Sequence, residues 1–154
     1  MFRGASIACA RLGRFVVAVH PLREPVDAEW SRYLDFLLSP DRPESPSVFV
    51  YSVGGGPTSK QRKVLAERTK GMLLPTAVVT PSPVTRAIGV AVSWFNPHIR
   101  MFSPADLHDA LAHLRLAPPE STDVLAAALR LANALSIRRA EVDLNLELRM
   151  RRAG

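Results

Sequence analysis

The chain has 154 residues, the usual length of one domain, and its 47% hydrophobic and 22% charged residues exclude a wholly disordered protein. Its net charge of +6 favours acidic partners, but no aromatic residues are interleaved with the basic stretches, which makes a nucleic-acid site a weak hypothesis. A single cysteine excludes an internal disulfide, and no apolar run reaches the roughly 20 residues of a membrane span, so we expect a soluble cytoplasmic protein.

The N-terminal part of the chain predicts a β-hairpin followed by a helix. Ser6–Ala10 and Phe15–His20 are expected as strands, with Gly13 at the turn between them. A helix is expected from Asp27 to the residues before Pro40, because aspartate favours helix starts and apolar side chains recur along one face. The proline-containing stretch after this helix is expected to be a surface loop.

Three further strands alternate with helices in the middle of the chain. The strands are expected at Val48–Val53, Thr76–Thr80 and Ile99–Phe102, and a helix from Pro57 to about Lys70 connects the first two. The next helix, Val84–Phe95, is apolar nearly all round, which predicts that it is either deeply buried or covered by a partner chain. The alternation predicts an α/β fold with one mixed, mostly parallel sheet and helices packed on it.

The C-terminal part is expected to be a helical extension. We place the α/β domain at residues 1–117 and the extension at residues 118–154, with Pro118 and the proline after it as the separator. An alanine- and leucine-rich helix is expected to start near Ser121. For residues 141–150 the alternating pattern indicates a strand, whereas the residue types indicate a helix, so both alternatives stay open.

A glycine-rich turn is the strongest candidate for a ligand site. Glycines let a ligand approach the backbone closely, and the N–H groups at the start of the following helix favour an anion. The spacing matches neither a P-loop nor a dinucleotide-binding fingerprint. A tight structural connection, a small-anion site and a nucleotide site are therefore the alternatives. The candidate residues are Ser52, Gly54, Gly55, Gly56, Thr58, Ser59 and Lys60.

A second polar turn is expected beside the first. Ser82, Thr85 and Arg86 follow the strand Thr76–Thr80, and the carboxyl ends of neighbouring parallel strands meet at one rim where ligands gather. Both turns are therefore expected to face this rim. The alternative is that Ser82 caps a helix and Arg86 makes an ordinary surface pair.

The sequence contains no recognisable catalytic or metal-binding constellation. His108 and His113 stand about 140° apart around a helix axis, and no cysteine or carboxylate joins the histidines at ligand spacing. No serine occupies a nucleophile elbow, and paired catalytic carboxylates are absent. We therefore expect no metal, no cofactor and no catalytic residue, and the sequence favours a protein that is not an enzyme.

The element order resembles that of the STAS family, the sulfate-transporter and anti-sigma-factor-antagonist domains, over about residues 5–116. One similarity is the buried strand Ser47–Ser52, which enters a turn and a helix; the other is Phe102–Leu114, similar to the closing strand and helix of bacterial STAS-like proteins. In that family a partner kinase phosphorylates a serine at the helix start, which switches protein binding. The resemblance implies this role for Ser59, with Thr58 as the second choice.

The leading functional hypothesis is a non-catalytic regulatory or protein-interaction domain of STAS-like fold. It would dimerise or bind a protein partner, with phosphorylation or anion binding at the glycine-rich turn. The alternative hypothesis is a domain that binds an anionic small molecule or a nucleotide at this turn, or a weak enzyme. The expected interface residues are Ile88, Val92, Trp94 and Phe95.

Overall fold

The structure is a computed structural model that describes residues 1–41, 45–94 and 96–137. The strands are β1 (Phe2–Arg3), β2 (Ala8–Leu12), β3 (Phe15–His20), β4 (Ser47–Ser52), β5 (Thr76–Val79) and β6 (Ile99–Phe102). The helices are α1 (Asp27–Leu37), α2 (Ser59–Arg68), α3 (Pro83–Ser93), α4 (Leu107–His113) and α5 (Pro118–Ala134), with a short 3₁₀ segment, Pro104–Asp106, before α4.

The six strands form one sheet in the order β1-β2-β3-β4-β5-β6. β1, β2 and β3 pair antiparallel, whereas β3, β4, β5 and β6 pair parallel, so the predicted mixed, mostly parallel sheet is confirmed. Gly13 has a φ of 55° in the turn between β2 and β3, a conformation that glycine adopts without steric cost. The sequence does not predict β1, because a two-residue strand is too short for a detectable pattern.

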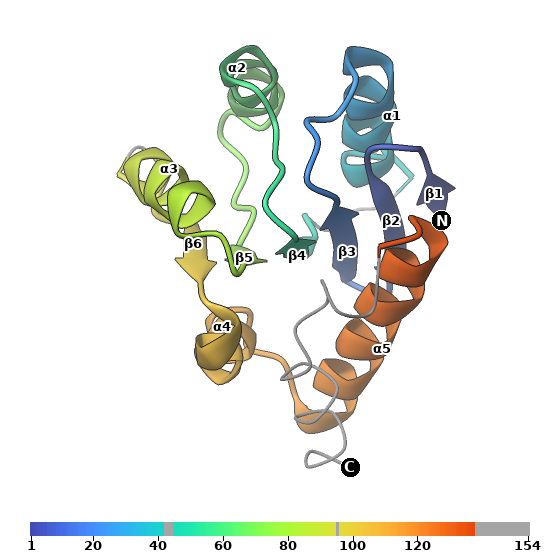
Figure 1. The fold of residues 1–154 in the computed structure, drawn as a ribbon, viewed down its shortest axis with the longest axis vertical. Helices are drawn as coiled ribbons and strands as arrows, with labels where there is room; N and C mark the ends of the chain where they lie inside the picture. Colours follow the sequence, from blue (N-terminus) through green and yellow to red (C-terminus); the bar gives the residue numbers. More distant parts are fainter. Residues whose placement is uncertain (42–44, 95, 138–154) are drawn as a thin grey trace.

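The helices cover the sheet in two layers (Figure 1). α1, α2 and α3 each connect two neighbouring parallel strands, and they lie above the sheet in Figure 1, whereas α4 and α5 lie below it. Right-handed crossovers between strands that follow one another in sequence order place all the connecting helices on one face. The edge strand β6 therefore has α3 on one side and α4 on the other.

Each face of the sheet has its own hydrophobic cluster. On the α1 face, Trp30 and Leu34 share a cluster with Val16 and Ala18 of β3. On the opposite face, α4 and α5 share a cluster with the alternate residues of the central strands. β3 and β4 are buried along their whole length, which explains why their sequences are apolar on both faces.

Two helices begin elsewhere than the sequence predicts. α2 begins at Ser59 rather than Pro57, because Thr58 is its N-cap residue. α5 begins at Pro118 rather than near Ser121, so its two prolines lie in the first turn of the helix. Proline costs little in the first turn of a helix, where the backbone N–H groups have no partner within the helix.

α5 packs against β2 and β3 and shares the hydrophobic cluster of α4. Arg3 of β1 donates a hydrogen bond of 2.7 Å to the carbonyl oxygen of Ala134, so the first strand is joined to the end of α5. The division between residues 117 and 118 stays a prediction, and residues 141–150 lie outside the described part of the chain. None of the described helices is long and apolar enough to cross a membrane.

Candidate functional site

The glycine-rich turn is held by hydrogen bonds within the chain. The Ser52 side chain is buried; its hydroxyl donates to the carbonyl oxygen of Gly55 and accepts a bond of 3.1 Å from the amide of Gly54. The amide of Gly55 donates to the carbonyl oxygen of Pro21 at 3.0 Å. A Cβ atom at Gly55 would lie 2.2 Å from that oxygen, so this position requires glycine. These amides therefore stabilise the turn rather than point to an empty anion site.

The second polar turn lies against the first. The Thr85 hydroxyl donates to the carbonyl oxygen of Gly54 at 2.7 Å and lies 3.0 Å from the Ser82 hydroxyl. Ser82 caps α3 by accepting a bond of 3.2 Å from the amide of Thr85. The Arg86 guanidinium donates to the carbonyl oxygen of Thr80 at 2.7 Å. The structure thus brings both turns together; Ser82 caps a helix, as in the alternative, whereas Arg86 binds a backbone carbonyl rather than making a surface pair.

The start of α2 has a capping box that uses two of its backbone amides. The Gln61 amide donates to the Thr58 hydroxyl at 3.2 Å, and the Thr58 amide donates to the Gln61 side-chain oxygen at 3.0 Å. Ser59, the first residue of the helix, is exposed, and its hydroxyl accepts a bond of 3.0 Å from the Arg62 guanidinium. Lys60 forms an exposed ion pair with Asp27 at 3.2 Å. Ser59 is therefore the accessible hydroxyl at the start of this helix.

Gln61 joins α2 to α1 by contacts that the sequence does not reveal. Its side-chain amide donates to the carbonyl oxygen of Pro25 at 2.7 Å and to Asp27 at 2.9 Å. The indole N–H of Trp30 donates to the backbone oxygen of Gln61 at 3.1 Å. The hydrogen bond from Gln61 lowers the pKa of Asp27, and Lys60 lowers it further. In the sequence, Gln61 is marked only by its capping-box spacing from Thr58, which indicates a helix start and not a link to α1.

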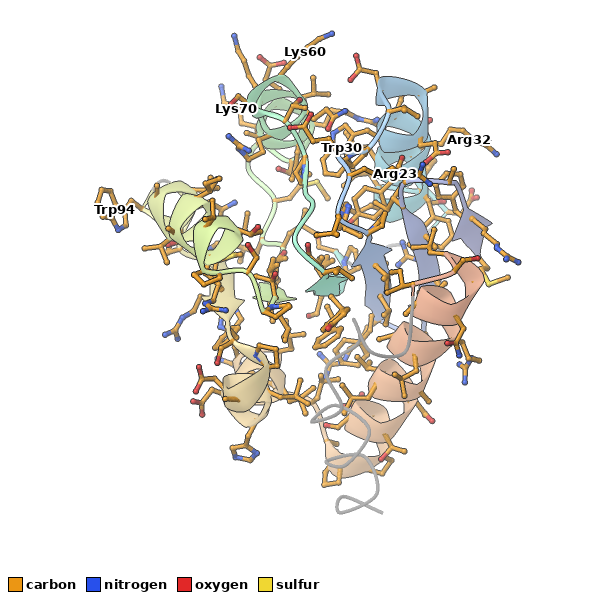
Figure 2. The ribbon with its side chains drawn as sticks, in the orientation of Figure 1. Arg23, Trp30, Arg32, Lys60, Lys70 and Trp94 are labelled. Atoms are coloured by element: carbon orange, nitrogen blue, oxygen red, sulfur yellow. The ribbon has the colours of Figure 1, made fainter. Side chains whose placement is uncertain are left out.

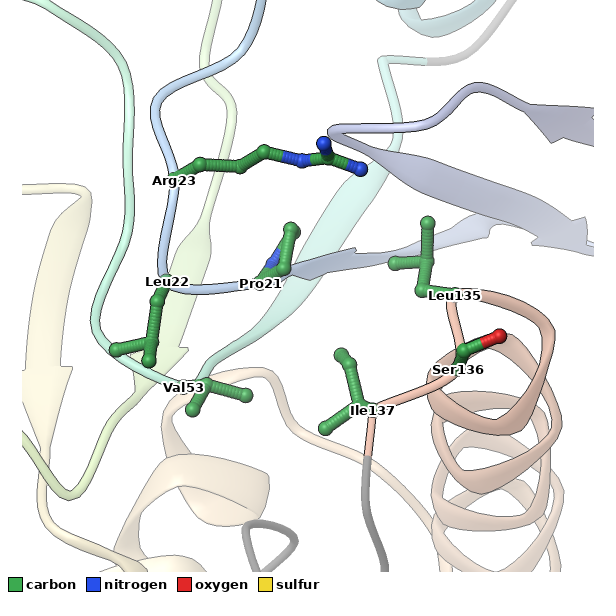
Figure 3. Close-up of a pocket in the computed structure, with 7 residues that line it drawn as sticks. All are labelled: Pro21, Leu22, Arg23, Val53, Leu135, Ser136 and Ile137. Atoms are coloured by element: carbon green, nitrogen blue, oxygen red, sulfur yellow. The ribbon is translucent and has the colours of Figure 1, made fainter.

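Two surface hollows have linings that include neither Ser59 nor the three glycines, although the first lies next to Gly54 and Gly55. One has a volume of about 270 Å³ and is lined by Pro21, Leu22, Arg23, Val53, Leu135, Ser136 and Ile137 (Figure 3). Its lining is mostly apolar, and the Arg23 guanidinium donates to the backbone oxygen of Ala5. The other has a volume of about 560 Å³ and is lined by Arg100, Met101, Phe102, Asp106, Asp109, Ala112 and His113.

α3 presents an apolar surface instead of a buried one. None of its residues, all of which the structure describes, is buried, so the expectation of deep burial is wrong. The helix packs on the sheet mainly at β6, and no element of the described residues lies above its outer side (Figure 1). Trp94 is 79% exposed and points away from the molecule (Figure 2).

The other expected interface residues on this helix differ in exposure. Ile88 is exposed and Val92 is partly buried, while Phe95 lies outside the described residues.

The titratable side chains Arg100, Asp106, Asp109 and His113 gather at the second hollow. Within the described residues, no group of three or more His, Cys, Asp or Glu side chains could hold a metal ion. His20 is buried, and burial lowers its pKa to about 4. Its Nδ1 atom has no hydrogen-bond partner among the described residues. Its ring lies 6.3 Å from that of Trp30, under α1.

Comparison with known proteins identifies the fold. No family model matches the sequence, and no curated protein matches it. The structure is similar to the crystal structure of an uncharacterized protein of the DUF3478 family with a SpoIIAA-like fold, from Shewanella loihica PV-4, with a TM-score of 0.51. The chain has a SpoIIAA-like fold.

The similarity covers 71% of this chain and 94% of the Shewanella protein, at 14% sequence identity. SpoIIAA-like folds are STAS-like, so the predicted resemblance is confirmed at the level of the fold. At this identity a shared SpoIIAA-like fold carries no function with it.

Proposed function

We propose that this chain is a non-catalytic protein-interaction domain whose partner docks on α3. The observation that carries the proposal is an exposed apolar stripe along this helix. We call the stripe, made of Val84, Ala87, Ile88, Ala91 and Trp94, the α3 stripe; all five residues are exposed. Their spacing places them on one face of the helix, and none of them carries a charge.

An apolar stripe of this kind exposes hydrocarbon surface to water, which is unfavourable in free energy unless a partner buries it. Val84 is 70% exposed and Ile88 47% exposed, so a partner could still bury much of their surface. Burial of apolar area contributes roughly 25 cal/mol per Å². Contiguous exposed apolar surface commonly marks a protein–protein contact in soluble domains. The α3 stripe therefore supports docking of a protein better than the polar turns support a ligand.

Phosphorylation of Ser59 would give this domain a switch. Ser59 is exposed at the first position of α2, where the helix dipole favours a negative charge. The Arg62 guanidinium already contacts its hydroxyl and could pair with a phosphate. An anionic ligand at the glycine-rich turn has less support, because the amides of Gly54, Gly55 and Thr58 donate within the chain.

Site-specific photo-crosslinking in cells of the source organism tests the docking proposal. A benzophenone amino acid in place of Ala91 should form a covalent adduct with whatever protein covers the stripe. The matched control places the same group at Asp123, an exposed residue of α5 on the opposite face of the sheet. We expect a discrete adduct from position 91 and none from position 123.

The identity of the adduct is read by mass spectrometry, and a second copy of the chain counts as a partner. Absence of an adduct from position 91, under conditions where a benzophenone at a known interface reacts, would contradict the proposed function.

A further inference from the structure

The outer edge of β6 has no strand beside it in the described part of the chain. The amide of Thr80 donates to the carbonyl oxygen of Phe102 at 3.0 Å, so the C=O group of Phe102 faces β5. Because successive peptide groups of a strand alternate in direction, the N–H and C=O groups of Met101 point to the outer edge. β6 contains no proline, a residue that often blocks pairing at sheet edges. This edge is therefore able to accept an extended peptide at Met101.

The hollow of about 560 Å³ lies along the same edge, between β6 and α4. The Ser103 hydroxyl donates to Asp106 at 2.6 Å, just beyond the carboxyl end of β6. At the amino end, Nε2 of His113 lies 3.1 Å from the carbonyl oxygen of His98, so α4 runs back along β6 as a wall of the hollow. The side chain of Met101 packs on α3, so this residue lines the hollow from its backbone edge. An edge strand beside a groove is the arrangement in which proteins bind an extended peptide as an added strand.

This groove contains charges of both signs that are not paired with each other. Arg100 of β6 and the carboxylates Asp106 and Asp109 all line it and are all exposed. Among the described residues, none of the three has an ion-pair partner. The Arg100 guanidinium lies 5.8 Å from the centre of the Phe102 ring, within the range of a cation–π contact. These charges are therefore available to a ligand that offers an acidic and a basic group.

We propose that this groove binds an extended segment of a partner protein as an added antiparallel strand, an inference that goes beyond the function proposed above. The site is separate from the α3 stripe. Gly89 is the residue of α3 that packs on Met101, and at ~100° per residue the stripe lies on the other side of the helix from Gly89. The stripe therefore faces away from β6.

The register of the added strand predicts the sequence that it carries. One residue of the segment exchanges both backbone bonds with Met101. Its two neighbours stand opposite Arg100 and Phe102, and their side chains enter the groove because opposed residues of paired strands share a face. The residue opposite Arg100 is acidic, and the residue opposite Phe102 is basic and reaches the Asp109 carboxylate. From amino to carboxyl end, the motif is therefore Lys or Arg, any residue, then Asp or Glu.

Fluorescence anisotropy of the full chain with a labelled peptide tests this motif. The probe is a short threonine-rich peptide that contains Lys-Val-Glu once, at its centre. We expect saturable binding with a dissociation constant below about 1 mM. In the control peptide the Lys and Glu are exchanged, so that each meets a like charge in the groove. This exchange should weaken binding by at least about tenfold.

Variants of the chain place the peptide in the groove. Asp109→Lys should weaken binding of the probe by at least about tenfold, because its basic side chain then meets a like charge. Asp123→Lys makes the same change of charge at an exposed position on α5 and should leave the dissociation constant within about twofold. Combining Arg100→Glu with Asp109→Lys should make the chain prefer the exchanged peptide. Circular dichroism should show the same fold in all variants.

N-methylation of the probe tests strand addition. The methyl group is placed on the valine between Lys and Glu, whose N–H donates to the carbonyl oxygen of Met101 in the proposed register. It removes that donor and blocks the approach of the strand, so the dissociation constant should rise by at least about tenfold.

The outcomes separate this inference from the proposed function. Absence of binding at about 1 mM probe, or equal binding of the probe and its N-methylated form, overturns the added strand. Equal binding of the probe and the exchanged peptide by the native chain overturns the charged motif and the proposal with it. In each case an adduct at position 91 still supports docking on the α3 stripe. Loss of that adduct while the probe binds as expected contradicts the proposed function and retains the groove.

Discussion

α1 and α3 lie on the same face of the sheet but distribute their apolar residues in opposite ways. α1 buries Trp30, Tyr33, Leu34 and Leu37 against the sheet, whereas α3 buries no residue. The two tryptophans illustrate the contrast in Figure 2: Trp30 points into the space between α1 and α2, and Trp94 points away from the molecule. The apolar residues of α1 are needed by the fold itself.

The apolar residues on the outside of α3 exceed what the fold requires. Trp94 and Val84 are 79% and 70% exposed, and removing them would cost the isolated chain little packing. A helix of this kind indicates a binding surface rather than a core. The comparison therefore predicts that substitutions in α1 act mainly on stability and substitutions in α3 mainly on association.

Truncation of one side chain in each helix gives the largest expected difference. Leu34 is fully buried, so Leu34→Ala should lower the free energy of unfolding by about 3 kcal/mol. Ile88→Ala, at a position 47% exposed, should lower it by less than about 1 kcal/mol. Urea unfolding, at a protein concentration low enough to keep the chain monomeric, measures both. Similar losses in the two variants would show that α3 is part of the core.

Acid should destabilise the α1 side of the molecule through His20. Its pKa is about 4 in the fold, against 6.5 for an exposed histidine, so the unfolded chain binds the proton more readily. The stability is complete above pH 6.5 and falls as the pH decreases toward 4, by up to about 3 kcal/mol. Asp27, Glu29 and Glu120 have lowered pKa values, so their own contributions to stability begin to be lost below about pH 5, and the loss between pH 6.5 and 5 is the part that reports His20.

Two matched variants test whether His20 causes this pH dependence of the stability. His20→Gln should flatten the stability profile between pH 6.5 and 5, whereas His108→Gln, at an exposed position, should leave it in place. Urea midpoints at several pH values provide the measurement. A profile that His20→Gln leaves unchanged would show that the buried imidazole is not the group responsible.

The N-cap of α3 should matter more than its apolar residues. Ser82→Ala removes the hydroxyl that accepts from the Thr85 amide and should cost about 1 kcal/mol. Ser93→Ala, near the other end of the helix, should cost less than about 0.5 kcal/mol. Thermal unfolding of the monomer compares them, and equal losses would argue against a capping role for Ser82.

The smallest effect is expected for the exposed ion pair between α1 and α2. Arg68 and Asp35 lie 2.9 Å apart with side chains 35% and 66% exposed. Asp35→Asn should change the free energy of unfolding by less than about 0.5 kcal/mol, and added salt should reduce the difference further. Double-mutant cycles with Arg68→Gln measure the coupling; a value above 1 kcal/mol would show that ion pairs help to hold these helices together.

Most of the fold could be predicted because its strands and helices have strong local patterns. β3 and β4 are continuous apolar runs between turn residues, and both are fully buried. The exposure of α3 could not be predicted, because the sequence of this segment does not reveal that β6 lies at the edge of the sheet. The start of α5 was misplaced since Pro118 permits a helix start as readily as a linker.

The residues of the candidate site were easier to predict than their contacts. Ser52 and Ser82 stand at strand and helix ends in the sequence, and the structure places their turns side by side. The sequence could not show that the Ser52 hydroxyl is bonded within its own turn or that Gln61 is buried, because both depend on chain segments brought close only by folding. Hydrogen bonds to the backbone of distant residues leave no periodic signal.

The link between Arg3 and the end of α5 has a consequence for synthesis of the chain. The sheet face beneath α5 includes residues of β2 and β3, which leave the ribosome long before residues 118–134 do. Until α5 is synthesised, this apolar sheet face stays uncovered and can associate with other chains. The fold is therefore complete only when α5 has formed. Nascent chains stalled before α5 should depend on chaperones that bind the uncovered face of the sheet.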